Sequence, residues 1–187
     1  MNRQPVLEGE RLHLRPLRED DWTALFAVAS DPLIWAVHPH HNRWQEATFR
    51  AFFDDALAHG GALVVIDRAS EAIIGSSRFQ GYDPADGGSV EVGWTFLARS
   101  HWGGDTNREL KWLMLAHALG CVERVDFRIG ETNLRSRRAM EKIGGRLSER
   151  SDVVDTASGP VRHVVYEIDR AGFAVGAAWD RNDHSLG

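Results

Sequence analysis

The stretch of residues 89–129 constrains the fold more than any other part of the sequence. An alternating apolar segment, Ser89–Leu97, is followed by a glycine pair, a helical pattern at 105–120 and a second strand pattern at 124–129. A strand, a helix and a strand in succession favour a parallel strand pair, because the helix carries the chain back to the starting end of the sheet. We therefore expect one parallel pair within the molecule.

The remaining patterns predict antiparallel strands and further helices around that pair. Strands are expected at 12–17, 62–67, 72–80, 146–154 and 161–169, and helices at 20–29, 45–59 and 133–143. Strands that follow one another directly pair most easily as antiparallel neighbours. The predicted fold class is α+β, or α/β in a looser scheme, with a mixed, mostly antiparallel central sheet and helices on both faces.

Composition places the chain among ordinary globular proteins. Its 187 residues, of which 43% are hydrophobic and 26% charged, fit one domain, expected at 1–172, with a loose tail at 173–187. Cys121 is the sole cysteine, so it cannot form an internal disulfide. No signal peptide and no apolar run of ~20 residues is visible, which predicts a cytoplasmic protein without a membrane partner. The net charge of -5 disfavours a nucleic-acid partner.

Gly103 and Gly104 precede the helix predicted at 105–120. Without side chains they let backbone N–H groups face outward, and with the helix dipole they form a site suited to a diphosphate. Thr106 and Glu109 have the spacing of a capping box, so the first helical turn is expected near residue 107. A glycine pair before a helix is also typical of a plain turn, and by itself it does not indicate a nucleotide.

The segment 133–145 predicts a helix with a polar start. Asn133 is suited to cap it, and Ser136 lies in its first turn. Arginines follow at positions 135, 137 and 138. They fit either a phosphate site or a solvated helix face, and the second is the more common interpretation of each residue alone.

Three motifs in this order resemble the GNAT acetyltransferase superfamily, and specifically its RimJ/RimL-like branch. They are Glu91-Val92-Gly93-Trp94, then Trp102-Gly103-Gly104 with Asn107 and Glu109, and then the helix with Asn133, Ser136 and Ile143-Gly144. The likeness spans residues 7–169, nearly the whole chain. It implies a GNAT-like sheet whose fourth and fifth strands, at 89–97 and 124–129, splay into a V.

The resemblance implies acetyl-CoA as the co-substrate. The pantetheine arm would bond to the backbone of the strand at 89–97, and the pyrophosphate would sit on the turn at 99–104. The implied cofactor contacts are Phe96, Leu97, Arg99, Gly103, Gly104, Asn107, Asn133 and Arg138. One position departs from the family pattern: Asp105 stands where a second small residue belongs, and a carboxylate facing inward there would repel a diphosphate.

The family moves the acetyl group to a primary amine by direct attack in a ternary complex, and holding the reactants in attack geometry supplies much of the rate. The amine must lose a proton, and Glu91 is the base that the resemblance implies. Ser136 resembles the serine that protonates the leaving thiolate. The structural alternatives, a solvent-facing strand glutamate and a helix-surface serine, stay open for these two residues.

The loop at 35–44 occupies the place where such proteins line the acceptor pocket. The expected acceptor contacts are Trp35, His38, Arg43 and Trp94. Packing in the core or at its rim is the alternative for the large side chains of the loop. His40 and His41 are adjacent, and no Cys, Asp or Glu joins them at ligand spacing, so we expect no metal.

Two other classes of function compete with the enzyme. A CoA-binding module of the same fold without catalysis would lack a competent base at Glu91. An RNA-associated module that uses the arginines at 135–138 fits the acidic net charge poorly. The acceptor itself, whether a protein N-terminus, a free amino acid, a polyamine or an antibiotic, is left open, and a homodimer is expected only from the habit of the family.

Overall fold

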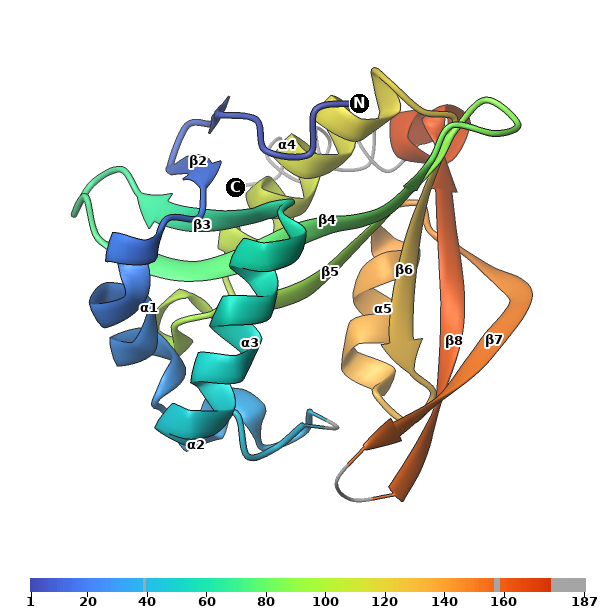
Figure 1. The fold of residues 1–187 in the computed structure, drawn as a ribbon. Helices are drawn as coiled ribbons and strands as arrows, with labels where there is room; N and C mark the ends of the chain where they lie inside the picture. Colours follow the sequence, from blue (N-terminus) through green and yellow to red (C-terminus); the bar gives the residue numbers. More distant parts are fainter. Residues whose placement is uncertain (39, 157–158, 176–187) are drawn as a thin grey trace. The chain divides into compact units, whose positions relative to one another are not determined.

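The computed structural model describes residues 1–38, 40–156 and 159–175, and these form two compact units (Figure 1). Unit 1 comprises residues 1–80 and 92–114, and unit 2 comprises residues 81–91 and the chain from Leu115 onward. Strand and helix boundaries follow the sequence patterns closely, and each unit has its own sheet segment and helices.

Unit 1 is built on a sheet of consecutive strands. Their order is β1 (Leu7–Glu8), β2 (Leu12–Pro16), β3 (Ala62–Asp67), β4 (Ile73–Asp83) and β5 (Ser89–Leu97), of which residues 81–83 and 89–91 belong to unit 2. The first four strands pair antiparallel. Ala62 lies opposite Arg78 and Val64 lies opposite Ser76, so these four side chains share one face of the sheet.

Three helices of unit 1 cover the face that carries Ala62 and Val64 (Figure 1). They are α1 (Trp22–Ala29), α2 (Pro32–Trp35) and α3 (Glu46–His59), preceded by a 3-10 turn at Glu19–Asp21. Phe49 and Phe53 of α3 and Phe96 of β5 pack together in the apolar core on this side. The core consists mainly of aromatic side chains, each of which buries a large apolar area.

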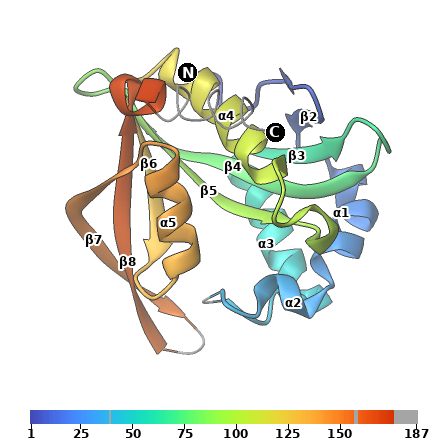
Figure 2. The same ribbon diagram turned by 180° about the vertical axis from the view of Figure 1, so that it is seen from behind.

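Helix α4 (Thr106–Leu119) begins in unit 1, and its first part covers the opposite face of the sheet (Figure 2). Successive residues of a strand point to opposite faces. Phe96 lies in the core beside α3, whereas the neighbouring Thr95 accepts a hydrogen bond from Nζ of Lys111 in α4 at 2.7 Å. The sheet of unit 1 is therefore covered on both faces, as the sequence predicts.

Unit 2 contains the parallel strand pair expected from residues 89–129. Ser89 to Glu91 of β5 pair with Arg124 to Asp126 of β6 (Arg124–Gly130), and the pairing ends at Glu91 and Asp126. Next come β8 (Gly159–Asp169) and β7 (Arg146–Thr156), both antiparallel to their neighbours. Within this unit, α5 (Leu134–Lys142) lies along β6 and β8 (Figure 2).

The hydroxyl of Tyr166 connects α5 to β8. It donates a hydrogen bond to Oε1 of Glu141 at 2.8 Å and accepts one from Nε of Arg137 at 3.2 Å. Because Tyr166 is fully buried, these bonds satisfy a polar group that would otherwise destabilise the core. Arg137, one of the arginines predicted to form a phosphate site or a solvated face, thus helps to hold this helix against β8.

The predicted α+β class is confirmed, and the mixed sheet has one parallel pair among antiparallel ones. The strand β1 and the single-turn helix α2 were not predicted. Residues 170–175 are helical, and the rest of the expected tail, 176–187, lies outside the described residues, as do residues 157–158 of the hairpin turn. The single-domain boundary at 172 stays a prediction. None of the helices in the described ranges is long and apolar enough to cross a membrane.

Candidate active site

The glycine pair forms an open turn directly before α4. Gly103 has a φ of +76°, a conformation that glycine adopts without strain. A Cβ placed on either Gly103 or Gly104 would meet no heavy atom within 4 Å among the described residues. The backbone of this turn is therefore accessible to a ligand group from outside, which is what a diphosphate at a helix N-terminus requires.

Asp105, the departure from the family pattern, is held by two arginines. Its Oδ2 accepts from Nη1 of Arg11 at 2.7 Å, and its Oδ1 accepts from Nη2 of Arg108 at 2.6 Å. Because two cations lie beside one carboxylate, the loop has no excess negative charge at Asp105. The fit of the turn to an anionic ligand is thus not impaired by Asp105.

Glu109, which the spacing predicts as part of a capping box, binds a distant segment of the chain, and the capping box itself stays a prediction. The helix begins at Thr106, and Oε1 of Glu109 accepts hydrogen bonds from the backbone N–H groups of Arg11 at 2.9 Å and Leu12 at 3.2 Å. These bonds fix the first turn of α4 to the start of β2. The support of the glycine turn therefore comes from a segment about 100 residues earlier in the chain.

The predicted cofactor residues of β5 lie at the end of that strand. Phe96 and Leu97 are both buried, and the carbonyl of Leu97 accepts from the indole N–H of Trp102 at 2.9 Å. Nε of Arg99 donates to Asp31 at 2.5 Å, so its charge is already partly neutralised. In this structure the side chains of these three residues contribute to packing and loop support. Their predicted contacts with a cofactor stay predictions, as does the contact of the exposed Asn107.

The loop at 35–44, which is predicted to line the acceptor pocket, contains both buried and half-buried side chains. Trp35 is only 2% exposed, and its indole N–H donates to the carbonyl of Ala29 at 2.7 Å, so it is a core residue of unit 1. Nδ1 of the half-buried His38 accepts from the backbone N–H of His40 at 3.0 Å. Pro39 lies outside the described residues.

Arg43 is placed against aromatic rings. Its Cζ lies 4.5 Å from the ring centroid of Phe52 and 5.7 Å from that of Trp35. Burial lowers the pKa of the Arg43 guanidinium to about 10, and the nearby Asp55 carboxylate opposes this shift. This site is thus apolar with a strongly desolvated cation, which favours contact with an anionic or π-rich group.

Trp94, the fourth predicted acceptor residue, interrupts the regular course of β5. Its φ of +53° is rare for a residue with a side chain, and such outliers concentrate at binding sites. The guanidinium carbon of Arg78 lies 5.2 Å from the centroid of its ring. Arg78 was not among the residues predicted from the sequence.

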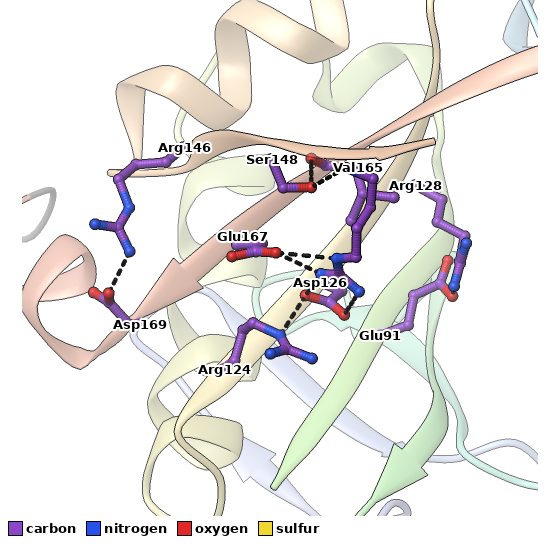
Figure 3. A network of polar contacts seen from close by, with 10 residues as sticks. Glu91, Arg124, Asp126, Arg128, Arg146, Ser148, Val165, Glu167 and Asp169 are labelled. Carbon is purple, nitrogen blue, oxygen red and sulfur yellow. Dashed lines mark hydrogen bonds and ion pairs between the residues drawn. The ribbon is translucent and has the colours of Figure 1, made fainter. Parts of the chain in front are cut away.

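Glu91 lies in unit 2 at the last residue of the parallel pairing between β5 and β6. Figure 3 shows its carboxylate turned toward Arg128, whose Nε donates to Oε2 of Glu91 at 2.9 Å. The side chain of Glu91 is 14% exposed. The interpretation of Glu91 as a strand glutamate that simply faces solvent does not fit this burial.

Burial raises the pKa of the Glu91 carboxyl, and this effect outweighs the Arg128 partner, which lowers it. The Asp126 carboxylate adds to the upward shift by repulsion. Asp126 itself is buried, is bound by both terminal nitrogens of Arg150 at 2.7 and 3.0 Å, and also accepts from Nε of Arg124 (Figure 3). A carboxylate with a raised pKa accepts a proton more readily than an exposed one, as a general base must.

The predicted residues of α5 also belong to unit 2. Oδ1 of Asn133 accepts from the backbone N–H of Ser136 at 3.2 Å, which confirms the predicted helix cap. Ser136 is half-buried in the first turn, and Arg138 is exposed. The roles of these three residues toward a cofactor stay predictions.

A buried lysine was missed by sequence reasoning. Lys111 of α4 donates to Oγ1 of Thr95, which in turn lies 2.8 Å from Oγ of Ser77. Burial lowers the pKa of the Lys111 ammonium to about 7. The two hydroxyls each lie 3.4 Å from the carbonyl of Gly93, so this network supports the backbone directly before the positive φ of Trp94.

Among the described residues, no group of three or more His, Cys, Asp or Glu side chains has an arrangement suited to a metal ion.

Comparison with known proteins agrees with this fold and these motifs. The family model described as "Acetyltransferase (GNAT) domain" matches residues 11–146, most of the chain. The chain therefore belongs to the GNAT acetyltransferase family, whose members transfer an acyl group from acetyl-CoA to an acceptor. No curated protein sequence matches significantly.

Solved structures support the fold at low sequence identity. A GCN5-related N-acetyltransferase from Brucella melitensis is 21% identical with a TM-score of 0.81, over 95% of this chain and 85% of that chain. A GNAT-family acetyltransferase from Bacillus anthracis is 21% identical with a TM-score of 0.72, over 88% and 98%. Mycobacterium smegmatis RimJ, solved in complex with CoA-disulfide, is 16% identical with a TM-score of 0.68, over 86% and 82%.

Proposed function

We propose that this chain is an acetyl-CoA-dependent N-acetyltransferase that acetylates a primary amine, on a protein N-terminus or a small molecule, by direct attack in a ternary complex. The observation that carries the proposal is Glu91. Its carboxylate is shielded from solvent, has a raised pKa and lies where the β5–β6 pairing ends. A non-catalytic CoA-binding module has no need of such a group.

The chain's residues take four roles in this proposal. Glu91 removes a proton from the acceptor ammonium, directly or through water, so that the neutral nitrogen can form the new C–N bond. The thioester of acetyl-CoA supplies an activated carbonyl, and its C–S bond breaks. The Ser136 hydroxyl donates a proton to the departing sulfur and regains one from solvent. The backbone of Gly103 and Gly104 holds the diphosphate.

Two features of the turn before α4 support the binding of acetyl-CoA. The glycine positions are open on the outside, and the carboxylate of Asp105 is neutralised by Arg11 and Arg108. A RimJ relative binds a CoA derivative, which supports the assignment to the RimJ/RimL-like branch as part of this proposal. A cytoplasmic location, a homodimeric state and the absence of nucleic-acid partners belong to the same proposal.

An acetyl-CoA consumption assay across an amine panel tests the function. The panel contains peptides with different N-termini, free amino acids, polyamines and aminoglycosides, and release of the CoA thiol is measured. We expect at least one amine to raise the release rate far above hydrolysis in buffer, with a mass increase of one acetyl group on that amine. Tight acetyl-CoA binding without transfer to any class would instead favour the non-catalytic module.

The ion pair between Glu91 and Arg128 predicts a shift in the pH profile. Arg128 lowers the pKa of Glu91, so Arg128→Met removes that influence and the pKa of Glu91 rises. Since the base must be ionised, the acidic limb of kcat/KM against pH should move to higher pH, and activity should recover at alkaline pH. The second partner of Arg128, Asp152, is about half exposed and can be solvated.

Arg162→Met is the matched control. Arg162 lies on β8 and pairs with Glu131 at 3.2 Å, with no part in the pKa of Glu91. Its pH profile should coincide with that of the wild type. If Arg128→Met leaves the acidic limb in place, the ionisation that limits activity is not that of Glu91.

A further inference from the structure

Arg78 is a buried cation that the mechanism does not use. It lies on β4 in unit 1, is 2% exposed and is among the largest fully buried side chains of the chain. Nη1 donates to Oδ2 of Asp55 in α3 at 2.7 Å. Nε and Nη2 are also buried, and neither has a hydrogen-bond acceptor among the described residues. Buried guanidinium donors without acceptors are strongly unfavourable, so this edge calls for an acceptor from outside the protein.

The two unpaired nitrogens form one side of the planar guanidinium. Nε and Nη2 carry parallel N–H bonds that match the two oxygens of a carboxylate. Asp55 binds Nη1 and leaves both N–H bonds of that side available together. The geometry is that of a bidentate site, which favours a planar anion over a single water molecule.

Gln80 supplies the opposite hydrogen-bonding character nearby. It is two residues beyond Arg78 on β4, so both side chains stand on the same face of the sheet. Its Oε1 is buried and has no donor among the described residues. An unsatisfied donor pair and an unsatisfied acceptor on one face match a ligand that carries a carboxylate and an N–H group.

The charge around Arg78 favours an anion. Asp55 is the partner of Arg78, and it also acts on the desolvated Arg43. Asp55 is 49% exposed and lies 3.0 Å from Nδ1 of His59 as well, so its single charge is shared and screened. The buried Arg78 and the half-buried Arg43 therefore share the influence of one partly solvated carboxylate, and the ring of Trp94 lies beside Arg78.

We propose that the Nε/Nη2 edge of Arg78 binds the carboxylate of the amine acceptor, so that the acceptor is a small amino acid rather than a protein N-terminus. The inference rests on the proposed function and narrows it. The α-amino group of a peptide N-terminus is followed by an amide, which lacks the paired anionic oxygens that this edge fits. A free amino acid carries both the carboxylate that fits this edge and an N–H group from which the Gln80 oxygen could accept a hydrogen bond.

Matched ligand pairs test the inference by binding alone. The probes are the L-amino acids and their carboxamides, each added to the full-length protein saturated with CoA, and the melting temperature is measured. At least one acid should stabilise the protein and bind about 100-fold more tightly than its amide, the scale expected for a desolvated bidentate charge pair. In Arg78→Met that preference should vanish. If no acid binds better than its amide, the inference is overturned.

Arg50→Met serves as the control variant, because Arg50 is an exposed arginine of α3 whose guanidinium lies over the ring of Trp22. It should keep the preference for acids. Arg78→Met should keep the acetyl-CoA affinity of the wild type, which would show that the variant folds. If Arg78→Met does not fold, Arg78→Lys replaces it. Lysine keeps the charge but lacks the paired N–H bonds of a guanidinium, so this variant should retain only a weakened preference for acids.

Two further outcomes separate this inference from the proposed function. An acid preference that depends on Arg78, with no acetyl transfer to any amine, would support the site and contradict the enzyme. Transfer to peptides or polyamines that is unaffected by Arg78→Met would support the enzyme and overturn the site. A preference for phosphoethanolamine over ethanolamine that exceeds every acid-to-amide ratio would overturn the carboxylate as the bound anion.

Discussion

Glu91→Gln is expected to lower turnover by roughly 100-fold or more near neutral pH, the usual scale for the loss of a general base. The substitution keeps the size of the side chain and one oxygen that can accept from Nε of Arg128. What it removes is the basic carboxylate. Turnover is measured as CoA release with the best amine of the panel, at saturating acetyl-CoA.

Three further expected results would make the loss of turnover specific to the general base. The affinity for acetyl-CoA should stay close to that of the wild type, because Glu91 is not a predicted cofactor contact. The deficit should shrink at high pH, where more of the acceptor amine is already neutral. Glu131→Gln, which alters a half-exposed glutamate of the same unit, should be fully active. Full activity of Glu91→Gln at neutral pH would assign the base to another group.

The second large effect is expected at the glycine turn. Gly104→Val should weaken acetyl-CoA binding by about 10-fold or more, because the added side chain stands where the diphosphate approaches the backbone, and a lost hydrogen bond to a charged group is worth about 1.5–3 kcal/mol. The Cβ would meet no heavy atom of the described residues within 4 Å, so the folded state should tolerate it. Calorimetric titration with acetyl-CoA measures the affinity, and the melting temperature without ligand checks the fold.

A pair of alanine variants separates backbone strain from the loss of the site. Gly103 and Gly81 both have positive φ, +76° and +59°, and a Cβ added at either position would meet no heavy atom of the described residues within 4 Å. Gly103→Ala and Gly81→Ala should therefore lose similar stability. Only Gly103→Ala should bind acetyl-CoA more weakly. Equal affinities in the two variants would remove the turn from the cofactor site.

The regular elements could be predicted because their apolar periodicity extends over enough residues. Strands Ala62–Asp67 and Ser89–Leu97 have the predicted bounds. Helix α3 begins one residue later than predicted, and α4 is one residue shorter than predicted at each end. β1, with two residues, and α2, with four, are too short to show a period. Their positions depend on pairing with β2 and on packing in the core.

The polar partners of the site could not be predicted, since they depend on register and on distant chain segments. The sequence identifies Asp105 as a departure, yet its neutralisation requires Arg11, 94 residues earlier. Glu91 follows from its motif, but Arg128 becomes its partner only through the parallel register of β5 and β6.

Arg78 was missed for a related reason. Ser76, Arg78 and Gln80 alternate with other residues in β4, a pattern typical of a solvent face. In the structure Asp55 of α3 binds Arg78, and the arginine is buried. Alternation along a strand indicates which residues share a face, but not whether a helix covers that face.

The chain passes between the two units three times, after residues 80, 91 and 114. Neither unit is therefore a continuous segment that could be excised and expressed by itself. A fragment that ends at residue 80 would lack Phe96 from its aromatic core and the whole of α4. Chimeras with other acetyltransferases that exchange one half of the chain at a single junction would split at least one unit, so only exchanges with several junctions can transfer one unit intact and alone.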